Sequence, residues 1–352
     1  MSATIRRAEP FRAYATLLPG VALAAAIAVV ATGIGHALPL LGAPVAGLIL
    51  GVALSRVLPA RPRLQAGVAF AGRTLLQVAV VLLGSALSLR QVAHVGASSL
   101  PVMLGTLAVC LALAYLLGRW LGIDRDLRTL IGVGTGICGA SAIAAVSPVI
   151  RARSADVAYA ISTIFLFNLV AVLAFPPLGH LLGLSQHDFG LFAGTAVNDT
   201  SSVVAAASTY GSSATDYAVV VKLTRTLMII PICLALAALV RGGEGSGEGF
   251  GEGSSERDGG SGVLRRVTRL VPWFLVGFIV LAALNSLGWI PSGAHGPLRD
   301  ASVFLITLAL AAIGLRTDIA GLRRAGSRPL LLGLLLWLAV AGTSLVLQWA
   351  AG

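Results

Sequence analysis

The sequence GVGTGICGASAIAAVSP, residues 132–148, places four glycines within eight residues of a run that is otherwise apolar enough to lie in a membrane. A glycine costs about 1 kcal/mol relative to alanine in a helix, and a plain lipid-facing helix has no reason to accept that cost. Broken membrane helices do accept it, because their freed backbone groups meet a ligand or another helix. The stretch therefore predicts a helix break near Cys138–Gly139, with close helix packing through small residues as the alternative.

The composition predicts an all-α polytopic membrane protein. Of the 352 residues, 57% are apolar and only 11% are charged, with a mean hydropathy of +0.92, whereas soluble proteins carry about 25% charged residues. The net charge of +11 lies between the apolar runs, which is typical of topology determinants and argues against a nucleic-acid partner. The three cysteines lie inside apolar runs without metal-ligand spacing, so no metal or other cofactor is expected.

Apolar runs of about 20 residues, the length that crosses a bilayer, predict eleven transmembrane helices within a single transport domain. The predicted spans are 14–32, 40–58, 74–89, 98–117, 127–150, 157–182, 189–210, 217–240, 271–290, 298–315 and 329–351. The fifth and the seventh are the most polar. Residues 242–262, between the eighth and ninth spans, are rich in Gly, Ser and Glu and are predicted to be a disordered cytoplasmic linker.

Arginine placement sets the predicted orientation, with the N-terminus in the cytoplasm and the C-terminus outside. Alternating the eleven spans puts 19 arginines in cytoplasmic segments and 4 in outer segments, as the positive-inside rule requires. Arg151 and Arg153, directly after the glycine-rich stretch, are the exception. They would lie on the other side if that stretch dips into the membrane and returns.

The seventh span repeats the pattern of the fifth. Residues 134–145 align without a gap over residues 194–205, sixty residues later, with identical Gly, Thr, Ser and Ala at four positions. Transporters often pair discontinuous helices from two repeats in this way, although chance similarity between small-residue spans gives the same match. The eleven-span topology makes the two spans parallel, whereas inverted repeats need antiparallel ones.

Residues 134–139 also fit the pattern G-x-G-x-x-G. A dinucleotide site needs that pattern after a strand in a soluble βαβ unit, which the sequence does not predict. Glycines also bring backbone N–H groups close to a bound group, and the N-terminus of a helix attracts anions. The predicted binding residues of this stretch are Gly136, Cys138, Gly139 and Ser141.

Few charged side chains lie well inside the spans. They are Asp199, which follows Asn198, and Lys222 with Arg225, which share one helix face. Each costs about 3 kcal/mol near the bilayer centre, so such residues face a cavity, pair with each other or mark a substrate path. Two cations against one acid favour an anionic substrate. A structural pair of the acid with one of the cations is the alternative.

Three motifs carry a family resemblance: ICGASAI at 137–143, NDTSSVVAA at 198–206 and KLTR at 222–225. With AAIGLRTD at 311–318, they make the chain similar to the YeiH-type family of bacterial inner-membrane proteins, which are described as candidate sulfate exporters. The resemblance covers nearly the whole chain and implies about ten or eleven helices. It also implies distant similarity to bile-acid/sodium symporters, whose inverted five-helix repeats have crossing broken helices. If the first span is extra, spans two to six and seven to eleven would be the repeats, and the fifth and tenth would cross. Many relatives have His where Asn198 stands, which puts a protonatable group at that position in doubt.

Together these observations predict a secondary active transporter of a small anion, sulfate or a sulfonate, working by alternating access in the lipid bilayer of a bacterial inner membrane. The side chains predicted to bind it beyond the broken fifth span are Asn198, Thr200, Ser201, Lys222 and Arg225. Asp199 would couple transport to H⁺ or Na⁺. The alternative is a cation or proton antiporter in which Asp199 binds the ion and Lys222 neutralises the empty site. No nucleophile–base pair supports an enzyme, a non-transporting membrane protein is a further alternative, and a homo-oligomer is compatible with the sequence.

Overall fold

The computed structural model describes residues 9–37, 42–57, 62–233, 235–236, 272–316 and 327–351, and every regular element in those ranges is helical. The elements are α1 (Glu9–Ala37), α2 (Gly42–Val57), α3 (Pro62–Phe70), η1 (Ala71–Leu75), α4 (Leu76–Leu83), η2 (Gly84–Ala86), α5 (Leu89–Trp120), α6 (Arg125–Gly136), α7 (Ala140–Val146), α8 (Ser154–Leu181), α9 (Gln186–Ala196), α10 (Thr200–Tyr210), α11 (Ser212–Thr226), α14 (Trp273–Ser286), α15 (Ser292–Leu315) and α17 (Ser327–Ala351). The linker predicted at 242–262 lies outside the described residues.

Six described helices are long and apolar enough to cross a membrane, which confirms the class of a polytopic helical membrane protein. They are Thr16–Ala37, Arg63–Ala86, Leu89–Trp120, Ser154–Leu181, Ser292–Leu315 and Ser327–Ala350. Helices α2 and α14 are apolar but shorter. The third predicted span, 74–89, begins too late, because the helix already starts at Pro62 and continues through the π-helical turn η1. Proline is well tolerated in the first turn of a helix, so it starts this one rather than breaking it.

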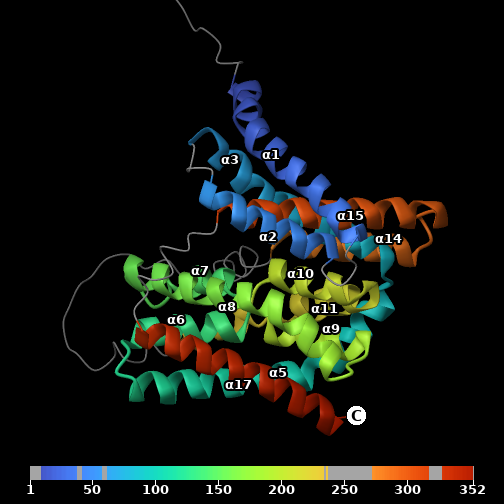
Figure 1. The fold of residues 1–352 in the computed structure, drawn as a ribbon. Helices are drawn as coiled ribbons and strands as arrows, with labels where there is room; N and C mark the ends of the chain where they lie inside the picture. The colour runs from blue at the N-terminus through green and yellow to red at the C-terminus, as the bar shows by residue number, and fades with distance from the viewer. Residues whose placement is uncertain are drawn as a thin grey trace, which may run out of the picture.

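The helices form two groups, which are seen one above the other in Figure 1. Helices α1 to α4 pack with α14 and α15, while α5 to α9 pack with α11 and α17; α10 lies against α2 and α15 and joins the groups. Glycines let backbones approach closely in the first group. A Cβ at Gly51 would lie 2.3 Å from the Ala311 carbonyl oxygen, and one at Gly314 would lie 2.5 Å from that of Leu48. Larger residues at these two positions would force α2 away from α15.

The fifth predicted span, 127–150, is a helical hairpin. Helix α6 ends at Gly136, the chain turns at 137–139, and α7 begins at Ala140. The Ile143 side chain packs against Gly134, where a Cβ would lie 3.0 Å from Ile143 Cδ1. Beyond α7, Arg153 Nη2 lies 3.0 Å from Oδ2 of Asp124, the residue that precedes α6. Residues 127–150 therefore do not form the single crossing that the eleven-span topology assumed, since α7 folds back toward the start of α6.

The seventh predicted span, 189–210, folds back in the same way, so that prediction of a single crossing is also wrong. Helix α9 ends at Ala196 and α10 starts at Thr200. The Tyr210 hydroxyl, at the end of α10, donates to the Leu184 carbonyl at 2.5 Å, just before α9. The backbone N–H of Ser213 donates to Gln186 Oε1 at 3.1 Å. Both ends of this second hairpin thus lie together.

Helix α8 connects the open ends of the two hairpins. Its 28 residues span about 42 Å at 1.5 Å per residue. It begins beside the open end of the α6–α7 hairpin and ends beside that of the α9–α10 hairpin. The hairpins therefore enter from opposite ends of the layer, and their tips point toward each other. Equivalent half-helices of the two hairpins therefore run antiparallel, as inverted repeats require. The eleven-span topology had made the two spans parallel.

The tenth predicted span, 298–315, lies within the continuous helix α15. The expectation that it is broken and crosses the fifth is therefore wrong. The second break lies in the seventh span instead, where the repeated sequence pattern is found.

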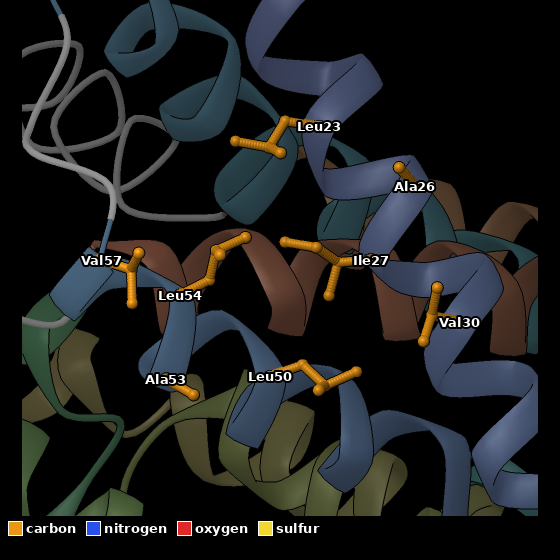
Figure 2. A pocket seen from close by; sticks show the side chains of 8 residues that line it. All are labelled: Leu23, Ala26, Ile27, Val30, Leu50, Ala53, Leu54 and Val57. Carbon is orange, nitrogen blue, oxygen red and sulfur yellow. The ribbon is translucent and has the colours of Figure 1, made fainter.

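An apolar groove of about 450 Å³ lies between α1 and α2, far along the chain from both hairpins. Figure 2 shows the side chains that line it, which are Leu23, Ala26, Ile27, Val30, Leu50, Ala53, Leu54 and Val57. All of them are aliphatic. The groove therefore offers no polar group to a charged solute.

Candidate functional site

The tips of the two hairpins touch. A Cβ built on Gly139 would lie 3.4 Å from the Cβ of Asp199 and 3.7 Å from the carbonyl carbon of Asn198. The breaks also coincide in the ungapped alignment, because α6 ends at 136 and α9 at 196, while α7 begins at 140 and α10 at 200. The predicted break at Cys138–Gly139 is confirmed, and the sequence echo corresponds to a second break of the same form.

Gly139 gives the first tip its shape. Its backbone has φ 67° and ψ −129°, a combination that glycine adopts freely and that other residues avoid. It allows the chain to reverse between α6 and α7 within three residues.

Lys222 joins the two tips from α11. Its Nζ donates to the carbonyl oxygen of Ile137 at 3.0 Å and to that of Val197 at 2.6 Å. These are equivalent residues, sixty positions apart, and each stands at the C-terminal end of a half-helix. Such ends carry unpaired carbonyls and about half a negative charge. The ammonium group is completely buried, and among the described residues its hydrogen-bond partners are these carbonyls rather than a carboxylate.

Close packing of α11 on α9 brings Lys222 to this position. A Cβ at Gly194 would lie 2.8 Å from Val221 Cβ, and one at Gly190 would lie 2.9 Å from the Ala214 carbonyl oxygen. The two glycines remove the side chains that would hold the helices apart. The Lys222 stem therefore reaches the space between both tips.

Asp199 caps α10 and accepts four hydrogen bonds. Its Oδ1 accepts from the Ser201 hydroxyl at 2.6 Å and from the Ser202 N–H at 2.7 Å. Its Oδ2 accepts from the Ser202 hydroxyl at 2.9 Å and from Asn168 Nδ2 at 3.0 Å. A carboxylate has about four lone-pair sites, so protein donors fill them. The sequence left open a structural ion pair of Asp199 with Lys222. The structure shows Asp199 bonded to Ser201, Ser202 and Asn168 instead.

Asn168, in α8, was missed by sequence reasoning. Its Nδ2 donates to Asp199, and its Oδ1 accepts from the backbone N–H of Asn198 at 3.0 Å. It is buried and holds the second tip at two points. The available signal was a lone amide in the middle of the apolar span 157–182, where an unpaired polar group would be costly.

Replacing Asn168 with leucine is expected to loosen the tips, because it leaves a buried N–H of Asn198 unpaired and removes one donor from Asp199. The test uses a background in which Cys110 and Cys233 are replaced by Ser, so that Cys138, buried in the adjacent tip, is the remaining native thiol. In Asn168→Leu, Cys138 should react with a maleimide about tenfold faster or more than in the same background with Asn168. Asn285→Leu is the matched control, because Asn285 donates to Leu87 outside the hairpins. Equal Cys138 rates in wild type and Asn168→Leu would contradict this role.

Arg225 and Asn198 carry polar groups without partners. Arg225 Nη1 donates to the Thr195 carbonyl, but no described residue pairs with its Nε or Nη2. The side-chain N and O of Asn198 are likewise without a partner in the described part of the chain. Both residues are almost completely buried. Buried polar groups nearly always find a partner, so these donors and the Asn198 acceptor are suited to a bound polar molecule.

The other predicted site residues lie at or beside the tips. Cys138 is buried near Lys222 and Thr226, and Ser141 is exposed at the start of α7. Thr200 begins α10, and Ser201 is bound to the Asp199 carboxylate. Gly136 is the exception. A Cβ there would lie 3.0 Å from Leu107 Cδ1, so Gly136 packs against α5.

No group of three or more His, Cys, Asp or Glu side chains within the described ranges is placed to hold a metal ion. The groups present at the tips are buried basic side chains, carbonyl ends and amide groups. Such groups interact with ions or polar molecules by electrostatics and hydrogen bonds.

Comparison with known proteins assigns the family. A family model described as "Conserved hypothetical protein 698" matches residues 19–333. The UPF0324 membrane protein SpyM3_0740 of Streptococcus pyogenes serotype M3 is 43% identical over 339 residues, which cover 95% of this chain and 97% of the relative. The chain belongs to the UPF0324 family of membrane proteins. Its YeiH-type resemblance is thereby confirmed.

Other UPF0324 members are similar along almost their whole length. The UPF0324 membrane protein SAG1125 of Streptococcus agalactiae is 40% identical over 339 residues, 95% of this chain and 98% of the relative. The protein spr0034 of Streptococcus pneumoniae is 42% identical over 334 residues, 93% and 95%. The UPF0324 names describe membrane proteins, so the protein's environment is a lipid bilayer.

Proposed function

We propose that this UPF0324 protein is a secondary active transporter of a small anion, which binds where the two hairpin tips meet. The observation that carries the proposal is the bond of Lys222 to both tips at once. The Lys222 ammonium bonds both hairpins at one point, so any movement of either hairpin changes its hydrogen bonds. Transporters build midplane sites from discontinuous helices of this kind.

The charges favour an anion over a cation. Lys222 and Arg225 are two completely buried basic side chains, and Arg225 has donors that no described residue pairs with. Asp199 has its acceptor sites filled by four protein donors, so its role here is to hold the tip rather than to bind a coupling ion. Sulfate or a sulfonate is the favoured substrate, because its oxygens accept several charge-assisted hydrogen bonds.

The hairpins also change the proposed topology. With two of the eleven predicted spans folded back, nine crossings remain, and the N-terminus still lies in the cytoplasm and the C-terminus outside. Arg151 and Arg153 then become cytoplasmic. With the other spans bounded as the sequence predicts, this raises the cytoplasmic arginines from 19 to 21 and leaves Arg90 and Arg299 outside. The bias of the positive-inside rule is thus stronger than in the eleven-span topology. The two hairpins, each followed by a helix, form an inverted pair in a bacterial inner membrane.

Uptake of labelled sulfate into proteoliposomes tests the proposal. Wild type is expected to transport sulfate, with competition from a small sulfonate, and Lys222→Met should lower the rate at least about tenfold, because the uncharged side chain frees both carbonyl ends. Arg90→Met is the matched control, since Arg90 is exposed at the start of α5. Equal rates in wild type and Lys222→Met would refute the site, and absence of oxyanion flux in wild type would refute the substrate class.

A further inference from the structure

The place that the Lys222 ammonium occupies has the chemistry of a cation site. Two backbone carbonyl oxygens face it at 3.0 and 2.6 Å, one from each hairpin. Half-helix C-termini and unwound carbonyls are the groups that coordinate Na⁺ in transporters with discontinuous helices. Here a side chain of the protein itself takes the position of the ion.

The C-terminal ends of the half-helices attract a cation. Each carries about −0.5 elementary charge, so the ends of α6 and α9 together carry about −1. The positive charge of Lys222 faces both ends, and Arg225 Nη1 donates to the Thr195 carbonyl at the end of α9 as well. Asp199 does not bond the Lys222 ammonium, because its two oxygens are already bonded to Ser201, Ser202 and Asn168.

The geometry also fixes the ammonium in place. Lys222 lies four residues before the end of α11. Its own carbonyl oxygen accepts from the Thr226 hydroxyl at 2.9 Å, and its side chain is completely buried. At one end of the same helix, Asp216 pairs with Arg299 at 3.3 Å, which ties α11 to α15. The side chain is therefore held at the contact between the tips.

We infer that Lys222 acts as a built-in monovalent cation that joins the two hairpins. The wild-type protein therefore needs no Na⁺ or K⁺ at this place. Truncation of the side chain at 222 opens a site for a small free cation. This inference deepens the proposed function. Its statement that transport is independent of Na⁺ rests on that proposed function. The ligand class is a monovalent cation of about ammonium size, such as ammonium, methylammonium, K⁺ or Na⁺.

Thermal unfolding of purified Lys222→Ala in detergent tests the new site without any substrate. At constant ionic strength, methylammonium or ammonium chloride should raise its Tm by at least about 3 °C over choline chloride, because a ligand that binds only the folded state stabilises it. Wild type and Arg90→Ala should show the same Tm in all these salts. Lys222→Ser, which keeps a hydroxyl as a further ligand, serves if the alanine variant does not fold.

Two results would overturn the inference. In the first, each Lys222 variant has the same Tm in choline, ammonium, methylammonium, K⁺ and Na⁺ chloride. That result is expected if water fills the space left by the truncated side chain. The other is sulfate flux by wild type that requires Na⁺. Failure of wild type to transport any oxyanion, with cation-dependent stability in the variants, would refute the proposed function and leave the cation site standing.

Discussion

Alanine at position 139 is expected to lower the free energy of unfolding by about 2–3 kcal/mol and the transport rate by about tenfold or more. Gly139 has φ 67° and ψ −129°, where any Cβ clashes with the local backbone. The new methyl group would meet Asp199 Cβ and Ile164 Cγ2 at 3.4 Å, which is ordinary contact. The cost is therefore backbone strain, and the tip would relax by changing the turn that brings it to Lys222.

Gly342→Ala is the matched control for Gly139→Ala. Gly342 lies within α17, and nothing lies within 4 Å of a Cβ built there. Its replacement should leave transport unchanged and Tm equal or slightly higher, because alanine favours a helix. Chemical denaturation and sulfate flux measure both variants. If Gly139→Ala behaves like Gly342→Ala, the described turn at 137–139 is not the functional one.

Alanine at position 199 is the second large expected effect, about 2–4 kcal/mol of lost stability together with loss of transport. The variant removes the cap of α10 and leaves Asn168 Nδ2 and the Ser202 N–H without their acceptor. Unpaired buried donors cost more than a lost hydrogen bond between exposed groups. The second tip would no longer be held against the first.

Asp188→Ala separates this effect from the loss of any acid at a helix start. Asp188 stands in the first turn of α9, bonded to Ser185 and half-exposed, so its removal should cost well under 1 kcal/mol. The Tm of both variants and their sulfate flux are the readouts. A normal Tm in Asp199→Ala, with loss only of pH- or Na⁺-dependent flux, would restore Asp199 as the coupling group.

The breaks themselves could be predicted from the sequence, because glycine clusters and an ungapped repeat leave a local signal. Both breaks lie where the alignment of 134–145 with 194–205 places them. The direction after each break could not be predicted, since a helix that continues and a helix that returns have the same composition. Contacts between distant residues decide it, such as Arg153 with Asp124. The one sequence signal was the misplaced arginine pair, Arg151 and Arg153.

The partners of the buried charges also needed the structure. Opposite charges in one membrane region suggest an ion pair, and Asp199 with Lys222 was such a candidate. Backbone carbonyls compete for the cation once a helix is broken, and that competition does not show in side-chain composition. Asn168 was missed for a related reason, because a single neutral amide in an apolar span has no charge to mark it.

Both broken segments fold back, so that the two open ends of each hairpin lie together. Side-specific labelling of single cysteines with a membrane-impermeant maleimide tests this arrangement most directly, in a background with the three native cysteines replaced. The exposed positions at the hairpin ends are Arg125, Ser154, His187 and Ser213. Cysteines at 125 and 154 are expected to react from one side of the membrane, and cysteines at 187 and 213 from the other. Labelling of 125 and 154 from opposite sides, or of 187 and 213 from opposite sides, would contradict it.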